Sequence, residues 1–218
     1  MDRELVVFAR APAPGQVKTR LAATVGDGAA RAFYEAFVDD TLAAAAEAAR
    51  RSGAGLVLAV AGDLAHPRVA AWARTSGAAL VAQPPGDLGA RLGAFFADGR
   101  HVCVIGSDAP QLGAAQLARG FDALVGHEVA IGPSRDGGYW LLGARRPIPE
   151  LLAGMPWSTP ELLSRTLEAL AGRSAALLEM AFDVDDADDL ALLQRWLAVA
   201  PPEIAPATRA ALARGAQP

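Results

Sequence analysis

Aspartates stand at two places in the sequence where they could contact a bound ligand or cation. Asp108 follows the apolar run 101–105, and residues 183–189 hold five carboxylates in seven positions. Hard oxygen ligands suit Mg²⁺ or Mn²⁺, and repulsion within the second group favours a bound cation. Helix capping is the alternative for Asp108, and also for Asp185 or Asp186, because Asp is common before a helix and in its first turn.

The segment Arg10–Arg20 carries cations in an arrangement that suits a phosphate-bearing ligand. Its cations are Arg10, Lys18 and Arg20, and Gly15 lets the backbone approach a ligand closely. Backbone N–H groups together with cations are what a polyphosphate needs. The spacing matches neither the GxxxxGK[ST] loop nor GxGxxG. Taken alone, the segment is explained equally well by a surface turn with solvated charges.

Lys18 is distinctive because it is the single lysine among 20 basic residues, the rest being arginine. Under such a bias an arginine could usually have served, so a retained lysine points to a role for a compact charge against phosphate. Chance retention is the alternative. We expect Lys18 to be an exposed loop residue that contributes little to stability.

A glycine-rich segment, residues 132–143, supplies candidates for the acceptor side of a site. Its paired glycines would let a substrate lie against bare backbone, and Asp136 stands on a loop that we expect to be mobile. Asp136 is therefore our candidate for contacting the acceptor or acting as base, with Lys18 as the second catalytic candidate. An Asp-Gly hairpin turn is the alternative. The predicted substrate-pocket residues are Gly137, Gly138, Tyr139 and Trp157.

Two further segments have the pattern of helix starts. Ser158 stands three residues before Glu161, which is the spacing of a capping box and predicts a helix beginning near Pro160. Asp87 is expected to cap a helix whose N-terminus faces the ligand. We add Arg91, from that helix, and Ser107 to the predicted nucleotide-binding residues.

Apolar runs of strand length alternate with helical stretches along the chain. The expected strands are 5–8, 56–60, 79–82, 101–105, 128–131, 139–142 and 176–178. The expected helices are 28–51, 67–74, 88–97, 114–125, 160–171 and 187–199. Apolar strands without alternating polar positions are buried on both faces, which predicts an α/β fold with a mostly parallel sheet between helices. Ligands of such sheets bind beyond the carboxyl ends of the strands, where the loop 10–20 and Asp108 would meet.

The composition is that of an ordinary globular protein. The chain has 218 residues, of which 52% are hydrophobic and 20% charged, and its net charge of −4 argues against non-specific nucleic-acid binding. Cys103 is the single cysteine and cannot form an internal disulfide. No apolar stretch is long enough to span a bilayer and the N-terminus shows no signal-peptide pattern, so we expect a cytoplasmic protein without a membrane partner. We expect one domain over residues 1–200 and a tail over 201–218 with a short helix.

Several motifs together resemble a known family. The runs FARAPAPGQVKTRL, GSDAPQL, GPSRDGGYWLLG, PWST and DVDDADDL occur in this order. They resemble a bacterial family of glycosyltransferase-like proteins, some of them described as arsenosugar-biosynthesis glycosyltransferases. This family is similar to the nucleotide-diphospho-sugar transferase superfamily, which includes molybdenum-cofactor and phospholactate guanylyltransferases. The resemblance covers about residues 4–198.

The resemblance implies a glycosyltransferase-A-like fold, a Rossmann-like α/β/α sandwich. It implies that the loop 10–20 holds base and phosphates, and that Asp108 and Asp185 bind Mg²⁺ or Mn²⁺. The implied partners are a nucleotide or nucleotide-sugar and a small-molecule acceptor. Asp186 replaces the threonine that usually follows the second metal ligand, which leaves the hydrogen bonding of that loop in question.

Three functions stay open under this resemblance. The nucleotidyltransferases of the superfamily usually have a glycine-rich first loop and a second lysine. This sequence has neither, which favours the first function, glycosyl transfer from a nucleotide-sugar. The second function is nucleotidyl transfer from a triphosphate to a phosphorylated small molecule. The third is a catalytically silent nucleotide-binding protein.

Overall fold

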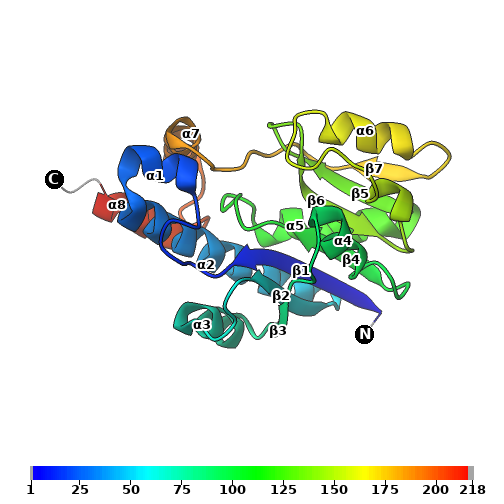
Figure 1. Ribbon diagram of the computed structural model, residues 1–218, viewed down its shortest axis with the longest axis horizontal. Helices are drawn as coiled ribbons and strands as arrows, with labels where there is room; N and C mark the ends of the chain where they lie inside the picture. Colours follow the sequence, from blue (N-terminus) through cyan, green and yellow to red (C-terminus); the bar gives the residue numbers. More distant parts are fainter. Residues whose placement is uncertain (1, 216–218) are drawn as a thin grey trace.

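Seven strands form one sheet in the order β3-β2-β1-β4-β6-β5-β7 (Figure 1). The computed structural model describes residues 2–215. The strands are β1 (Arg3–Arg10), β2 (Gly55–Ala61), β3 (Ala79–Ala82), β4 (His101–Ile105), β5 (Val129–Pro133), β6 (Tyr139–Ala144) and β7 (Ala175–Leu177). β6 runs antiparallel to β4 and β5, while the other neighbouring strands are parallel. The prediction of a mostly parallel sheet is confirmed.

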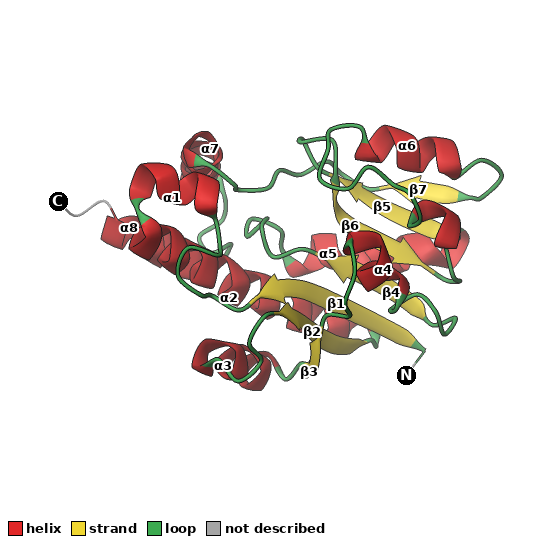
Figure 2. Cartoon of the chain, viewed as in Figure 1, coloured by secondary structure: helices red, strands yellow, loops and turns green. Residues whose placement is uncertain are grey.

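Helices cover both faces of this sheet (Figure 2). They are α1 (Thr19–Val25), α2 (Asp27–Ser52), α3 (Pro67–Ser76), α4 (Leu88–Gly93), α5 (Ala114–Gly126), the 3₁₀ helix η1 (Pro149–Leu151), α6 (Leu162–Ala169), α7 (Ala187–Val199) and α8 (Pro206–Gly215). None of the helices within residues 2–215 combines the length and apolar character that a bilayer span requires. The predicted fold class, an α/β sandwich, is confirmed.

Alternation along β1 divides the apolar core between the two faces. Leu5 and Val7 pack with buried residues of α2, α3 and α5, whereas Val6 packs in a second cluster with Leu92 of α4 and Leu151 of η1. Successive strand side chains point to opposite faces, so an apolar strand is buried on both sides only when helices cover each face. This packing keeps the ends of the central strands in fixed positions.

The predicted helix start at Ser158 is wrong. α6 begins at Leu162, and Ser158 has a positive φ of 63° instead of the extended backbone of a helix cap. The backbone N–H of Leu163 is satisfied by the carbonyl of Gly137, at 2.8 Å, from the turn between β5 and β6. A tertiary contact therefore replaces the local capping box that the sequence pattern suggested.

The last described helix packs on the domain through a buried carboxylate. Asp40 of α2 is 5% exposed and accepts hydrogen bonds from the backbone N–H groups of Ala207 (2.9 Å) and Thr208 (2.7 Å). These N–H groups lie in the first turn of α8, where they have no partner within their own helix. Ala205 and Ala211 are buried in one cluster with residues of α1, α2 and α7. Residues 216–218 of the expected tail lie outside the described residues.

We expect Asp40→Ala to lower the free energy of unfolding by about 1–3 kcal/mol, because two N–H groups at the start of α8 lose their acceptor. Urea denaturation followed by circular dichroism measures the change. Asp122→Ala is the matched control, since Asp122 is exposed on α5 and its loss should change stability by less than about 0.5 kcal/mol. Equal effects of the two substitutions would contradict this role of Asp40.

Candidate functional site

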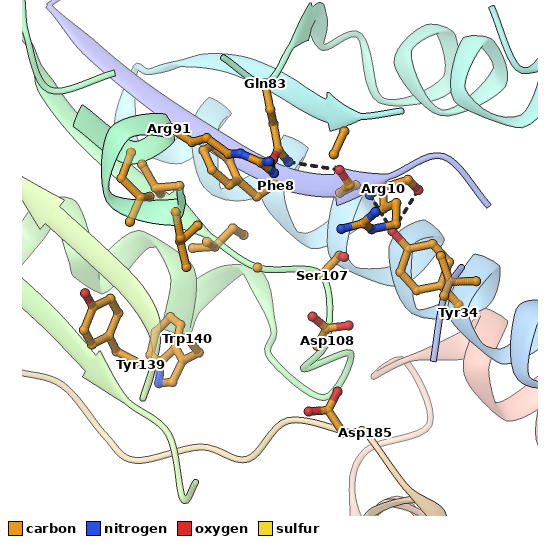
Figure 3. Close-up of a pocket in the computed structure, with 18 of the residues that line it drawn as sticks. Phe8, Arg10, Tyr34, Gln83, Arg91, Ser107, Asp108, Tyr139, Trp140 and Asp185 are labelled. Atoms are coloured by element: carbon orange, nitrogen blue, oxygen red, sulfur yellow. Dashed lines mark hydrogen bonds between the residues drawn. The ribbon is translucent and has the colours of Figure 1, made fainter. Parts of the chain in front are cut away.

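A cavity of about 440 Å³, which we call the main cavity, opens beyond the carboxyl ends of β1 and β4 (Figure 3). Its volume lies within the range of small-molecule and cofactor sites. Of the predicted site residues, those that line it are Arg10, Lys18, Arg91, Ser107, Asp108, Tyr139 and Asp185. These residues come from segments far apart in the sequence, as expected for a site at the carboxyl edge of a sheet.

Lys18 stands between the two aspartates that were predicted as metal ligands. Its ammonium group contacts Oδ1 of Asp108 and, at 2.8 Å, Oδ1 of Asp185. The side chain of Lys18 is only 5% exposed, so the expectation of an exposed loop lysine is wrong. Burial disfavours its charged form, but the two carboxylates outweigh burial and raise the pKa of Lys18 above its ordinary value.

The backbone at Lys18 is held in an uncommon conformation. Lys18 precedes α1 and has φ 48° and ψ 45°, the left-handed region that a residue with a Cβ rarely adopts. Such a conformation costs on the order of 1–2 kcal/mol. The ion pairs with Asp108 and Asp185 stabilise this arrangement of the loop. No sequence pattern pointed to α1, whose start places Lys18 at the floor of the main cavity.

Backbone hydrogen bonds bring the second aspartate group next to Asp108. The N–H of Val184 donates to the carbonyl of Asp108 at 2.9 Å, and the side-chain amide of Gln111 donates to the carbonyl of Phe182 at 2.6 Å. Asp185 thereby lies beside Lys18, and the charge of Lys18 contributes to lowering the pKa of Asp185 against the effect of burial. Sequence reasoning missed Gln111, because a polar side chain before a helix carries no specific signal.

The capping alternative applies to Asp186 and not to Asp185. The Asp186 carboxylate accepts hydrogen bonds from the backbone N–H groups of Asp188 and Asp189, each at 3.1 Å, and so caps α7. Asp185 instead faces Lys18 and Arg20, with Arg20 Nη2 at 2.6 Å from its Oδ2. Its carboxylate is therefore available for a role other than capping.

Asp183 is the most strongly perturbed carboxyl group of the site. Burial, followed by the nearby negative charges of Asp108, Asp136 and Asp185, raises the pKa of Asp183 to about 7. Three further carboxyl groups thus act on Asp183, and two of them, Asp108 and Asp185, contact the Lys18 ammonium. This concentration of negative charge is the feature that the sequence pattern of residues 183–189 suggested.

The opposite end of the main cavity is built around Gln83, which sequence reasoning missed. Its side-chain amide donates to the carbonyls of Ala9 and Ala59, both at 3.0 Å, and its Oε1 accepts from Arg91 at 3.3 Å. Gln83 thus joins β1, β2 and α4 at the cavity wall, as Figure 3 shows. Asp87 caps α4 as predicted, accepting from the N–H of Ala90 at 2.8 Å.

Tyr34 holds the backbone of Arg10 at the edge of the cavity. Its hydroxyl accepts from the N–H of Arg10 at 2.7 Å and donates to the carbonyl of Arg10 at 2.9 Å. Burial raises the pKa of Tyr34 to about 12, so it stays a neutral donor at physiological pH. Within residues 2–215 the Arg10 guanidinium makes no hydrogen bond or ion pair, which leaves it free for a ligand.

Asp136 and the paired glycines do not line the main cavity. They form the turn between β5 and β6, where Asp136 Oδ1 accepts from the N–H of Gly138 at 2.9 Å. Gly137 has φ 88°, and a Cβ there would overlap the carbonyl of Pro160. Gly137 is therefore required for packing against Pro160, and the loop that we expected to be mobile is anchored there.

Asp136 instead lines a separate cleft of about 210 Å³, which we call the outer cleft. Its lining includes Arg20, Asp183 and Asp185. Arg20, predicted with the phosphate-binding loop, thus lies on α1 beside the outer cleft and not in the main cavity. Asp183 and Asp185 form the border between the outer cleft and the deeper part of the site.

Gly15 and Trp157 also lie outside the lining of the main cavity. Gly15 has φ 68°, so it serves the turn of the loop, and open space surrounds the position of a Cβ. The ring of Trp157 packs edge-on against Tyr139, with centroids 6.3 Å apart. Trp157 therefore supports Tyr139, which lines the cavity, instead of forming its wall.

Comparison with known proteins identifies the family. The family described as "Uncharacterized protein conserved in bacteria (DUF2064)" matches residues 41–159. The chain belongs to this family. A search of curated protein sequences finds no relative.

Solved structures extend the comparison to nearly the whole chain. A "putative nucleotide-diphospho-sugar transferase" from Desulfovibrio desulfuricans G20 is 30% identical, with a TM-score of 0.85 over 98% of this chain and 94% of that chain. The DUF2064 protein is accordingly an enzyme of the transferase class with this fold, and the resemblance seen in the sequence is confirmed.

Two more distant structures share the fold alone. A nucleotidyl transferase from Methanothermobacter is 17% identical, with a TM-score of 0.57 over 90% of this chain and 97% of that chain. Glucosyl-3-phosphoglycerate synthase from Mycobacterium tuberculosis, solved with Mn²⁺, UDP and glucosyl-3-phosphoglycerate, is 15% identical. Its TM-score is 0.51 over 88% of this chain and 76% of that chain.

Removing the Lys18 ammonium should destabilise the DUF2064 protein. We expect Lys18→Met to lower the free energy of unfolding by about 1–2 kcal/mol in the presence of a chelator. This is less than the ~3–5 kcal/mol of a fully buried pair, because Asp108 and Asp185 are 42% and 36% exposed. Urea denaturation measures the change, with Arg20→Met as control because Arg20 is 66% exposed. A loss no larger than that of Arg20→Met would contradict the central role of Lys18.

Asp183 should make stability fall as pH rises. Its pKa is about 7 in the folded protein and about 3.9 in an unfolded chain, so the folded state binds more protons between these values. The contribution of Asp183 to the free energy of unfolding therefore decreases from about pH 4 to pH 7. We expect Asp183→Asn to raise this free energy by about 1–3 kcal/mol at pH 8 and to change it little at pH 4.

Thermal unfolding of both proteins across this pH range tests the expectation for Asp183. Asp188→Asn is the control, because it removes an exposed carboxylate from the same acidic segment. A difference between wild type and Asp183→Asn that is constant with pH would overturn the assignment.

Proposed function

We propose that this protein is a metal-dependent glycosyltransferase that binds a nucleotide-sugar in the main cavity and transfers its glycosyl group to a small acceptor. The observation that carries the proposal is the set formed by Lys18, Asp108 and Asp185 at the floor of the main cavity. Nucleotide-sugars carry a diphosphate, which needs cations at the point where the leaving group gains charge. The fold shared with a nucleotide-diphospho-sugar transferase supports the same conclusion.

The carboxylate pair fits a divalent cation. Within residues 2–215, no three side chains of His, Cys, Asp or Glu are grouped so that they could hold a metal ion by themselves. Mg²⁺, however, is commonly held by one or two carboxylates together with substrate phosphates. Asp108 and Asp185 approach one ammonium group closely enough to share a cation in this way. A bound Mg²⁺ or Mn²⁺ would neutralise charge on the departing diphosphate.

The chain's own cations would complete the phosphate site. The Lys18 ammonium forms ion pairs with both carboxylates. It would be able to contact phosphate oxygens once a metal ion takes over these pairs. Arg10 and Arg91 line the same cavity, and the Arg10 guanidinium makes no ion pair within the described residues. We propose that Lys18 and Arg10 bind the phosphates, while Arg91 and Gln83 border the nucleoside end.

Asp136 stays a candidate for the acceptor side of the reaction. Because it lines the outer cleft, it would contact only the part of an acceptor that extends into that cleft. The lysine and arginines of the main cavity would also suit a nucleoside triphosphate, so nucleotidyl transfer is the second candidate function. The missing glycine-rich first loop and the single lysine favour glycosyl transfer.

A thermal-shift screen with and without MnCl₂ tests the proposal. The ligands are UDP, GDP, CMP, their common sugar conjugates, GTP and CTP. A ligand at about 100 times its dissociation constant stabilises the folded state by about 2.7 kcal/mol, which is readily measured. Stabilisation by a nucleotide-sugar that requires metal supports the proposal. Pyrophosphate release from a triphosphate would establish the second candidate function, and binding that is independent of metal would overturn both.

Adjacent aspartates provide a matched pair of variants. We expect Asp185→Asn to reduce metal-dependent nucleotide stabilisation at least tenfold in apparent affinity, because a charged oxygen ligand is lost. Asp186→Asn should leave it unchanged, since Asn caps a helix about as well as Asp. Titration of both variants with Mn²⁺ and the nucleotide identified by the screen measures the difference. Equal effects of the two substitutions would remove Asp185 from the proposed metal site.

A further inference from the structure

A smaller chamber of about 140 Å³, which we call the side chamber, adjoins the main cavity at Asp108. The residues that line both spaces are Ile105, Gly106, Asp108, Tyr139 and Trp140. The side chamber is thus continuous with the wall of the main cavity next to the predicted metal ligand. The outer cleft, by contrast, shares only Asp185 with the main cavity. The side chamber therefore borders the main cavity more extensively than the outer cleft does.

The rest of the lining gives the side chamber a definite chemistry. Its apolar part is formed by Ala109, Leu112 and Leu117, and its polar part by Thr41 and Asp183. Among the described residues that line it, none is an arginine, lysine or histidine. Lys18 contacts Asp108, but it lines the main cavity and not the side chamber. A phosphate or carboxylate group in the side chamber would therefore face the carboxyl groups of Asp108 and Asp183 with no basic side chain of the chamber to bind it.

Thr41 provides the observation that points to a ligand. It lies on α2, is 5% exposed, and its hydroxyl has no hydrogen-bond partner among the described residues. A buried hydroxyl without a partner costs about 1–3 kcal/mol, so native structures nearly always supply one. Thr41 lines the side chamber, where a bound hydroxyl group would provide this partner.

We infer that the side chamber is the acceptor site and that it binds an uncharged, hydroxyl-bearing group such as a polyol or sugar. This inference rests on the proposed glycosyl transfer. Asp183 would accept a hydrogen bond from one hydroxyl, Thr41 would bond a second, and the leucines would contact the C–H groups between them. The lining offers no basic side chain to a phosphorylated acceptor, which nucleotidyl transfer would require. Arg20 and Arg135 line the outer cleft instead.

Saturation-transfer NMR with erythritol as the probe tests the inference on the full chain. We expect a signal for erythritol with the wild type and at least a threefold weaker one with Thr41→Val, which removes the hydroxyl at nearly constant shape. Thr41→Ser keeps the hydroxyl and should keep the signal. Ser134→Ala is the matched control, because Ser134 also has a buried hydroxyl without a partner but does not line the chamber. If Thr41→Val does not fold, Thr41→Ala replaces it, since it removes the same hydroxyl and introduces no new atom.

Three results would overturn the inference. The first is the absence of an erythritol signal, or a signal that Thr41→Val leaves unchanged. The second is a stronger signal for glycerol 3-phosphate than for erythritol, which would contradict the uncharged class. The third is a loss of affinity for UDP-glucose but not for UDP in Thr41→Val, which would assign the chamber to the donor sugar.

The thermal-shift screen separates this inference from the proposed function. Metal-dependent binding of a nucleotide-sugar without erythritol binding leaves the proposed function standing and rejects the acceptor site. Erythritol binding that depends on Thr41 without nucleotide binding supports the chamber as a polyol site and rejects glycosyl transfer.

Discussion

The contact of one ammonium group with two carboxylates organises the functional end of this molecule. Lys18 belongs to the loop after β1, Asp108 to the loop after β4, and Asp185 to the segment before α7, and the contact holds these three segments together. Without the positive charge, the carboxylates of Asp108, Asp183 and Asp185 would repel one another at close range. The position of each loop around the main cavity therefore depends on a cation at this point, and in the unliganded protein the chain supplies it.

The antiparallel strand β6 explains why two different environments meet at this cation. On one side, β1, β2 and α4 surround Gln83 and form a wall of hydrogen-bonded polar groups. On the other side, β6 brings Tyr139 and Trp140 to the border of the side chamber. Because β6 runs antiparallel to β4, the start of β6 lies beside the end of β4, at the edge of the sheet where the main cavity opens. The aromatic pair thus reaches the site together with the carboxyl ends of parallel strands.

Much of the fold could be predicted because it rests on local patterns. Apolar runs predicted the seven strands closely, and α7 (Ala187–Val199) begins and ends where its pattern predicts. The identity of the residues at strand ends likewise suggested Lys18, Asp108 and Asp185. What could not be predicted depends on contacts between distant segments. Gly137 looked like a ligand-binding glycine, yet it packs on Pro160, and no local signal distinguishes these uses. Gln83 and Thr41 matter only through what the fold places beside them.

The helix α2 connects the site to the far end of the chain. It spans 26 residues and carries three of the side chains described above. Tyr34 hydrogen-bonds the backbone of Arg10, Asp40 accepts from the first turn of α8, and Thr41 lines the side chamber. Tyr34 and Thr41 are two turns apart on a single rigid element about 40 Å long. A fusion or truncation that displaces α8 would remove the two donors of the Asp40 carboxylate, one residue away from Thr41 in the wall of the proposed acceptor site. Changes at α8 would therefore reach the proposed site through α2.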